Sequence, residues 1–165
     1  MFFDCETMKS VQIPDHVTSV GDYAFSGCAA LESVTLPSKL RSLGDHSFEN
    51  CRSLGRIEIP YGDTIVGNNA FKGCDHLVDV TIPNSVRIIG EGAFEGCETM
   101  SSILIPNSIT EIADWTFHDC FGLVRITIPN SVERIGASAF NGCRNLKNGM
   151  IPNSVGSLGS WAVAG

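Results

Sequence analysis

The stretch TIPNSVRIIGEGAFEGCETM, residues 81–100, carries Pro83 and Cys97, and both residue types return every 23 positions along the chain. The cysteines are Cys5, Cys28, Cys51, Cys74, Cys97, Cys120 and Cys143, and the prolines are Pro14, Pro37, Pro60, Pro83, Pro106, Pro129 and Pro152. A phenylalanine stands three residues before each cysteine, and a glycine stands sixteen residues after it except at Ala113. Such spacing without insertions predicts an array of 23-residue structural repeats.

Each repeat contains an alternation of apolar and polar residues, as in LVRITIP (123–129). This alternation is typical of a short half-buried strand, which ends at the proline because proline cannot donate to a ladder. A second apolar pair follows, such as Val86 and Ile89. A glycine then precedes residues such as Asp22 and Asn68, which favour a helix N-cap. They predict one helical turn of about six residues that carries the phenylalanine inward.

One repeat cannot bury its own apolar face, so we expect the copies to stack in register around a continuous core. The predicted fold is a leucine-rich-repeat solenoid: a parallel β-sheet with one short strand per 23-residue unit, and short helical turns on the other side. The chain, 1–165, is predicted to be a single array of seven units. Both ends cut through a unit, which favours a fragment of a longer array over ends sealed by end-to-end self-association.

The composition excludes several classes of partner. The formal net charge is −7, whereas nucleic-acid binding needs clustered Lys and Arg, so no nucleic-acid ligand is expected. No apolar run approaches the roughly 20 residues of a membrane helix, so we expect no membrane insertion by this segment. The stretch MFFDCETMKS at the start lacks the basic and apolar regions of a secretory signal.

The cysteines admit three interpretations. A disulfide framework normally uses an even number, and the chain has seven. Metal sites need clustered ligands with short spacings, which are absent. The favoured interpretation is a ladder of small, buried, reduced thiols. The four histidines fall at different repeat positions and no nucleophile with a base is indicated, so we predict no catalytic, cofactor-binding or metal-binding residues and no cofactor.

Function is expected where the outward columns of the strands vary. The most distinctive outward residues are Arg56, Glu58, Asp79, Leu104 and Arg125, and they predict a docking surface on the sheet. The alternative is a solvated β face that needs no ligand. Trp115 and Phe121 form a secondary candidate near the predicted helical turns, either as interface anchors or as half-buried fillers.

Two places break the pattern. In the third unit, YGDTIVG (61–67) puts Asp63 in an apolar column, and a buried lone carboxylate would be costly. We therefore expect a bulge that exposes Asp63, with Tyr61 or Ile65 covering part of the gap. Near the other end, Gly149 replaces the β-branched residue of the strand.

The pattern I-P-N-S-V-x-x-I-G-x-x-A-F-x-G-C-x-x-L, seen in SVRIIGEGAFEGC (85–97) and SVERIGASAFNGC (131–143), resembles the BspA-like class of leucine-rich repeats, the bacterial surface-antigen type. The resemblance covers essentially the whole chain. It implies a curved solenoid with a role in adhesion or protein recognition, often at a cell surface, and no catalysis. The favoured function is therefore a non-enzymatic recognition module with a protein ligand, or less often a glycan. A structural spacer is the alternative, and an accessory domain of an enzyme is the third.

Overall fold

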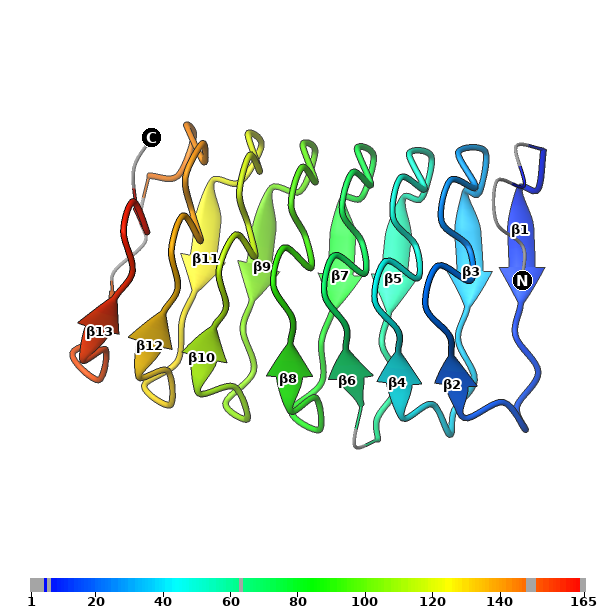
Figure 1. The fold of residues 1–165 in the computed structure, drawn as a ribbon, viewed down its shortest axis with the longest axis horizontal. Coiled ribbons are helices and arrows are strands. Elements are labelled where there is room, and N and C mark those ends of the chain that lie inside the picture. Colours follow the sequence, from blue (N-terminus) through cyan, green and yellow to red (C-terminus); the bar gives the residue numbers. More distant parts are fainter. Residues whose placement is uncertain (1–4, 6, 63, 148–150, 164–165) are drawn as a thin grey trace.

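The computed structural model describes residues 5, 7–62, 64–147 and 151–163. Over these residues the chain winds as a solenoid in which equivalent segments of successive units lie side by side (Figure 1). Asp63 and Gly149, the two pattern breaks, lie outside the described residues, so the expectations for them stay predictions. Of the neighbouring residues, Tyr61 is 80% exposed and Ile65 is 43% exposed, whereas Thr64 is buried and donates its hydroxyl to the Leu40 carbonyl over 3.0 Å.

The predicted strands form parallel sheets on one side of the solenoid. They are β1 (Ser10–Gln12), β3 (Ser33–Thr35), β5 (Arg56–Glu58), β7 (Asp79–Thr81), β9 (Ser102–Leu104) and β11 (Arg125–Thr127). Partners in the ladder are one repeat apart, as in Arg56 with Asp79 and Arg125 with Ser102. The middle residue of each strand faces the core and the two flanking residues are exposed, as the period of two requires.

The predicted parallel strands, one per 23-residue unit, are confirmed, and the second apolar pair forms a further short strand that was not predicted. These short strands are β2 (Ser19–Val20), β4 (Ser42–Leu43), β6 (Ile65–Val66), β8 (Ile88–Ile89), β10 (Glu111–Ile112), β12 (Arg134–Ile135) and β13 (Ser157–Leu158). They make their own parallel sheets, which lie toward the viewer in Figure 1. The second residue of a short strand, such as Val66, is buried, whereas the first, such as Ile65, is exposed.

The prediction of a helical turn is wrong: no helix occurs in the described part of the chain. In the segment that carries the phenylalanine, successive amides alternate between a hydrogen bond to the next unit and a turn within their own unit. The amides of Tyr23 and Phe25 donate to Asp45 and Ser47 carbonyls of the next unit over 2.9 and 2.8 Å, while Ala24 closes a turn onto Gly21 over 3.2 Å. A single helical turn would leave its first amides without a partner in the same unit, whereas the stacked turns satisfy them with carbonyls of the next unit.

The core is a row of stacked phenylalanine rings. Phe25, Phe48, Phe71, Phe94, Phe117 and Phe140 stack with centroid distances of 5.1–5.7 Å and interplanar angles of 4–8°. The predicted thiol ladder beside them is confirmed, since all seven cysteines are free and only Cys5 is not buried. The Cys97 thiol donates to the Phe71 carbonyl over 3.3 Å, and the thiols of Cys51, Cys74, Cys120 and Cys143 bond the equivalent carbonyl of the preceding unit in the same way.

The expected N-cap residues join neighbouring units instead of capping a helix. The Asp45 carboxylate accepts a hydrogen bond from the Asn68 amide over 2.8 Å, and Asp22 binds the Asp45 amide in the same way over 2.9 Å. For this contact the backbones of two successive units must approach closely at the glycine that precedes each of these residues. A Cβ on Gly67 would lie 2.6 Å from the Gly44 carbonyl carbon and 2.7 Å from the Asp45 amide nitrogen.

Gly67→Ala is therefore expected to lower the free energy of unfolding by about 2 kcal/mol, because the added methyl group overlaps backbone that side-chain motion cannot relieve. Gly21→Ala is the matched control, since no atom of the described residues lies within 4 Å of a Cβ at Gly21. Urea unfolding followed by circular dichroism measures both variants. Equal stability of the two variants would contradict the close-approach explanation.

Both sheets are interrupted at one boundary, between β7 and β9 and between β8 and β10. This boundary coincides with Ala113, the exception in the glycine column. The phenylalanine stack continues across it, although Phe94 and Phe117 are 5.7 Å apart, the widest interval in the stack. A hollow of about 300 Å³ lies between β8 and β10 and is bordered by Ala113. We attribute the separation of the short strands to the Ala113 methyl group, which occupies space that glycine leaves free elsewhere.

Candidate functional site

The outward side chains of the long strands form one exposed surface, which we call the long-strand face. Its described members are Ser10, Gln12, Ser33, Thr35, Arg56, Glu58, Asp79, Thr81, Ser102, Leu104, Arg125 and Thr127. The ladder places all five predicted binding residues on this face. The interruption between β7 and β9 divides them into a group on β5 and β7 and a group on β9 and β11.

The first group is a small charged cluster centred on Arg56. Its Nε lies 3.4 Å from Asp79 Oδ2, and its Nη2 lies 3.9 Å from Glu58 Oε2. The side chains of Arg56, Glu58 and Asp79 are 64%, 71% and 58% exposed. Ion pairs with this exposure contribute at most about 1 kcal/mol to stability. The cluster therefore presents charge to solvent more than it stabilises the solenoid.

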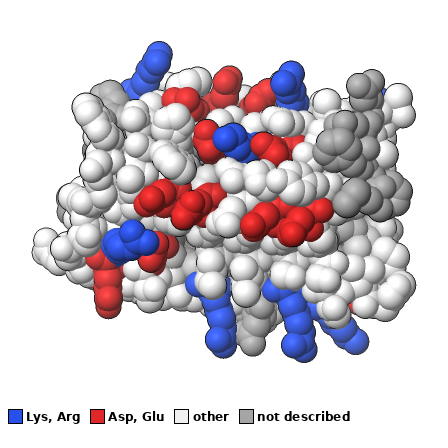
Figure 2. Space-filling view, in the orientation of Figure 1, with Lys and Arg blue, Asp and Glu red and all other residues white. Residues whose placement is uncertain are grey.

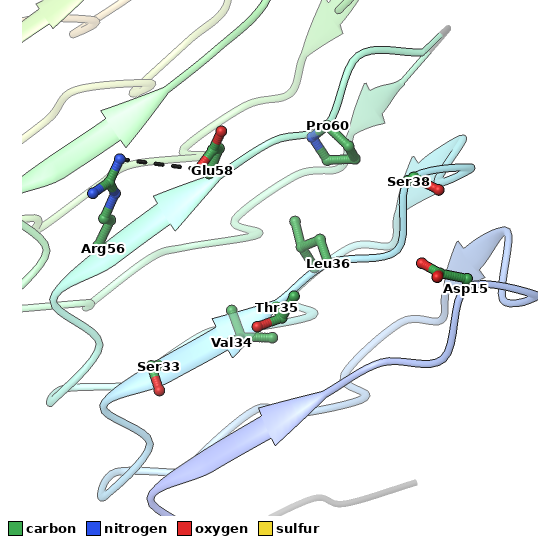
Figure 3. A pocket seen from close by; sticks show the side chains of 9 residues that line it. All are labelled: Asp15, Ser33, Val34, Thr35, Leu36, Ser38, Arg56, Glu58 and Pro60. Atoms are coloured by element: carbon green, nitrogen blue, oxygen red, sulfur yellow. Dashed lines mark ion pairs between the residues drawn. The ribbon is translucent and has the colours of Figure 1, made fainter.

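A hollow of about 390 Å³ lies beside this cluster (Figure 3). Arg56 and Glu58 rise from β5 on one side, while Ser33 and Thr35 of β3 are short and leave the space open. The half-buried Leu36 adds an apolar contact at the end of β3. The hollow arises because long side chains in one unit stand next to small ones in the neighbouring unit.

The second group contains an apolar residue beside another hollow. Leu104 on β9 is 64% exposed, and it lines a hollow of about 390 Å³ together with Thr127 and Pro106. Arg125 lies next to Ser102 in the register of β9 and β11. An exposed leucine between a proline and a threonine offers an apolar contact to a partner.

The two residues of the secondary candidate differ in exposure. Trp115 is 48% exposed. Phe121 is half-buried, and the Arg144 guanidinium carbon lies 5.2 Å from its ring centroid. Tyr23 and Trp161 were not among the predicted site residues, yet they occupy the same repeat position as Trp115 and are 43% and 73% exposed. Aligning the units in columns would have found both.

The opposite face, which carries the short strands, is rich in carboxylates. Figure 2 shows a row of acidic side chains across its middle, with the basic side chains mainly toward its edges. Asp22 follows β2 and Asp45 follows β4, and the Asp22 carboxylate accepts a hydrogen bond from the Asp45 amide. This arrangement disfavours anionic partners on this face.

Several chemistries find no support in the described residues. Within those ranges no cluster of three His, Cys, Asp or Glu side chains is suited to hold a metal ion. The Cys97 thiol is a poor nucleophile, because burial raises its pKa well above the usual value, with a smaller contribution from the neighbouring thiols. No helix in the described ranges is long and apolar enough to span a membrane.

The fold is a parallel β-solenoid of leucine-rich-repeat type. Its defining features are the stacked parallel strands, the 23-residue period and the inward ladders of phenylalanine and cysteine. The chain belongs to the BspA type leucine rich repeat region family, which matches in six copies over residues 1–120 and 64–165. Family and fold are those of leucine-rich-repeat proteins, which are typically non-enzymatic. A search of curated proteins finds no match.

Solved bacterial structures share the fold. A leucine-rich repeat protein from Bacteroides ovatus is 36% identical with a TM-score of 0.89, and the match covers 96% of this chain and 41% of that protein. The T. pallidum leucine rich repeat protein is also 36% identical, with a TM-score of 0.84 and coverage of 89% and 69%. A leucine-rich repeat protein from Eubacterium ventriosum is 25% identical, with a TM-score of 0.85 and coverage of 96% and 43%. The chain thus spans about two fifths of the Bacteroides protein.

Proposed function

We propose that the array is a non-enzymatic recognition module that binds a protein ligand through the long-strand face. The observation that supports this most is the unevenness of that face. Repeats that served only packing would carry similar outward residues, yet this surface combines the Arg56 cluster, the exposed Leu104 and two hollows. A charged group with an apolar contact and adjoining cavities is a common composition of protein interfaces.

A structural spacer within a larger protein is the second candidate. The continuous core and the hydrogen bonds between successive units make the array suited to hold two attached parts at a set distance. In that case the long-strand face would be solvated and substitutions on it would change nothing but solubility. The extent of the array as seven units within a longer protein stays a prediction.

Arg56→Glu combined with Arg125→Glu is expected to weaken binding of a protein ligand at least about tenfold, because both positive charges of the long-strand face are reversed. The free energy of unfolding should fall by no more than about 2 kcal/mol, because Arg56→Glu replaces two exposed ion pairs by repulsion from Glu58 and Asp79, so the variant should remain folded. The ligand would be isolated by affinity capture with the wild-type chain, purified and titrated by calorimetry.

Lys39→Glu combined with Arg41→Glu makes the same change in net charge outside the long-strand face and serves as the control. Equal loss of affinity in both double variants would mean that net charge, not this face, governs binding. Unchanged affinity in the Arg56 and Arg125 variant would exclude the face as the site and would favour the spacer.

A further inference from the structure

One repeat position carries three exposed aromatic side chains, those of Tyr23, Trp115 and Trp161. It is occupied by Tyr23, His46, Asn69, Gly92, Trp115, Ser138 and Trp161, and we call it the aromatic column. All seven residues have a left-handed backbone conformation, with φ between 53° and 61°. Glycine and asparagine adopt this conformation readily, whereas for tryptophan it costs about 1 kcal/mol or more. The fold itself therefore gives no reason for the two tryptophans.

The spacing of the column is fixed by hydrogen bonds between units. The Trp115 amide donates to Ala137 over 2.9 Å, and the Ser138 amide donates to Ser160 over 2.9 Å. Adjacent members are thus about one strand spacing apart, roughly 4.8 Å. Tyr23 and His46 show the result for two neighbouring rings, which stack with a centroid distance of 4.5 Å and an interplanar angle of 4°.

Trp115 and Trp161 are separated by one unit, and that unit carries the small Ser138. Their backbones are therefore roughly 10 Å apart, which is twice the strand spacing. A ring placed over Ser138 would lie about 5 Å from each indole, within the range at which flat rings stack. The column thus leaves a place for one additional ring between its two tryptophans, whose side chains are 48% and 73% exposed.

The residues around the position over Ser138, which we call its rim, are polar. Asp114 accepts the Ala137 amide at Oδ1 over 2.8 Å, and among the described residues no hydrogen bond occupies its Oδ2, which can accept one from a ligand. Ser160 is exposed and Asn141 is half-buried at neighbouring positions of the same turns. Such a rim suits a ring with hydroxyl groups around its edge, while the carboxylate repels an anionic ring.

We propose that Trp115 and Trp161 bind an uncharged sugar residue of a glycan, which stacks between the two indoles over Ser138. The C–H groups of the pyranose face the indole rings, and its hydroxyls pair with the rim around Asp114. This site lies away from the long-strand face, so it goes beyond the protein-recognition function proposed above and does not depend on it.

The chain contains only these two tryptophans, so its tryptophan fluorescence reports directly on the site. We would titrate the full chain with cellohexaose and with chitohexaose as neutral probes, and with heparin and alginate as anionic ones. Saturable quenching with a shift to shorter wavelength is expected for at least one neutral probe, because stacking excludes water from the indoles. The proposal would be overturned if neither neutral probe quenched the tryptophan fluorescence at millimolar concentration, or if only the anionic probes bound.

Calorimetry then tests the residues. Trp115→Ser and Trp161→Ser introduce the residue that Ser138 already provides at this repeat position, so they should fold, and each should weaken binding by at least about tenfold. Tyr61→Ser removes an aromatic ring that is 80% exposed elsewhere and should leave the affinity unchanged. Retained binding in both tryptophan variants would refute the site. The Arg56→Glu and Arg125→Glu variant should bind the glycan normally, which separates this proposal from the protein-binding function.

Discussion

Phe71→Ala is expected to lower the free energy of unfolding by about 4 kcal/mol or more. The Phe71 side chain is fully buried and stacks on Phe48 and on Phe94, with centroid distances of 5.5 Å in both pairs. Truncation would leave a cavity and would also remove two ring contacts, each of which contributes about 1 kcal/mol. Urea unfolding followed by circular dichroism provides the measurement.

The position of Phe71 within the array gives the variant a second signature. In a solenoid each unit contacts only its neighbours, so a weak unit in the interior separates the array into parts. We expect a broader transition with a lower denaturant m-value than in the wild type. Phe121→Ala is the control, since Phe121 is half-buried outside the stack, and it should cost less than half as much. Equal effects in the two variants would show that the stack is not the principal stabilising element.

The sequence predicts the fold well where the repeat period determines which residues are equivalent. Period and alternation correctly indicate the inward columns, the long strands and the parallel register. They do not determine the path of a segment such as 22–27, because its residues suit a helical turn as well as a stacked turn. The stacked turn is favoured because amides such as that of Phe25 gain a hydrogen-bond acceptor in the next unit. The sequence of a single unit does not reveal that acceptor.

The candidate site was predictable in part for the same reason. Alternation identifies Arg56 and Leu104 as outward, and both are exposed. The hollow beside Arg56 depends on the contrast with the small Ser33 in the adjacent unit, so it appears only when columns are compared across units. Ala113 was visible as an exception in the glycine column, but its association with interrupted strands requires knowledge of how closely the backbones approach.

The buried thiols are expected to make stability fall steeply in alkaline solution. Burial, the main cause, raises the pKa of Cys51 and of Cys143 to about 12 from an ordinary value of 9.0, and it raises the pKa of Cys74, Cys97 and Cys120 as well. Between about pH 9 and pH 12 the unfolded chain therefore binds fewer protons than the native one, so stability decreases as pH rises. Each thiol contributes about 1.4 kcal/mol per pH unit in this window. Below about pH 8 the thiols are protonated in both states and add no pH dependence.

Five such thiols act together, so a domain of ordinary stability should unfold within about two pH units above pH 9. The free energy of unfolding would be measured in urea at several pH values, and its slope counts the protons released on unfolding. Cys97→Ala should reduce the slope by about one proton, because one buried thiol is removed. Gly67→Ala serves as a destabilised control that retains every thiol and should keep the wild-type slope. A wild-type slope that stays flat above pH 9, or one that Cys97→Ala leaves unchanged, would show that the thiol ladder does not control alkaline stability.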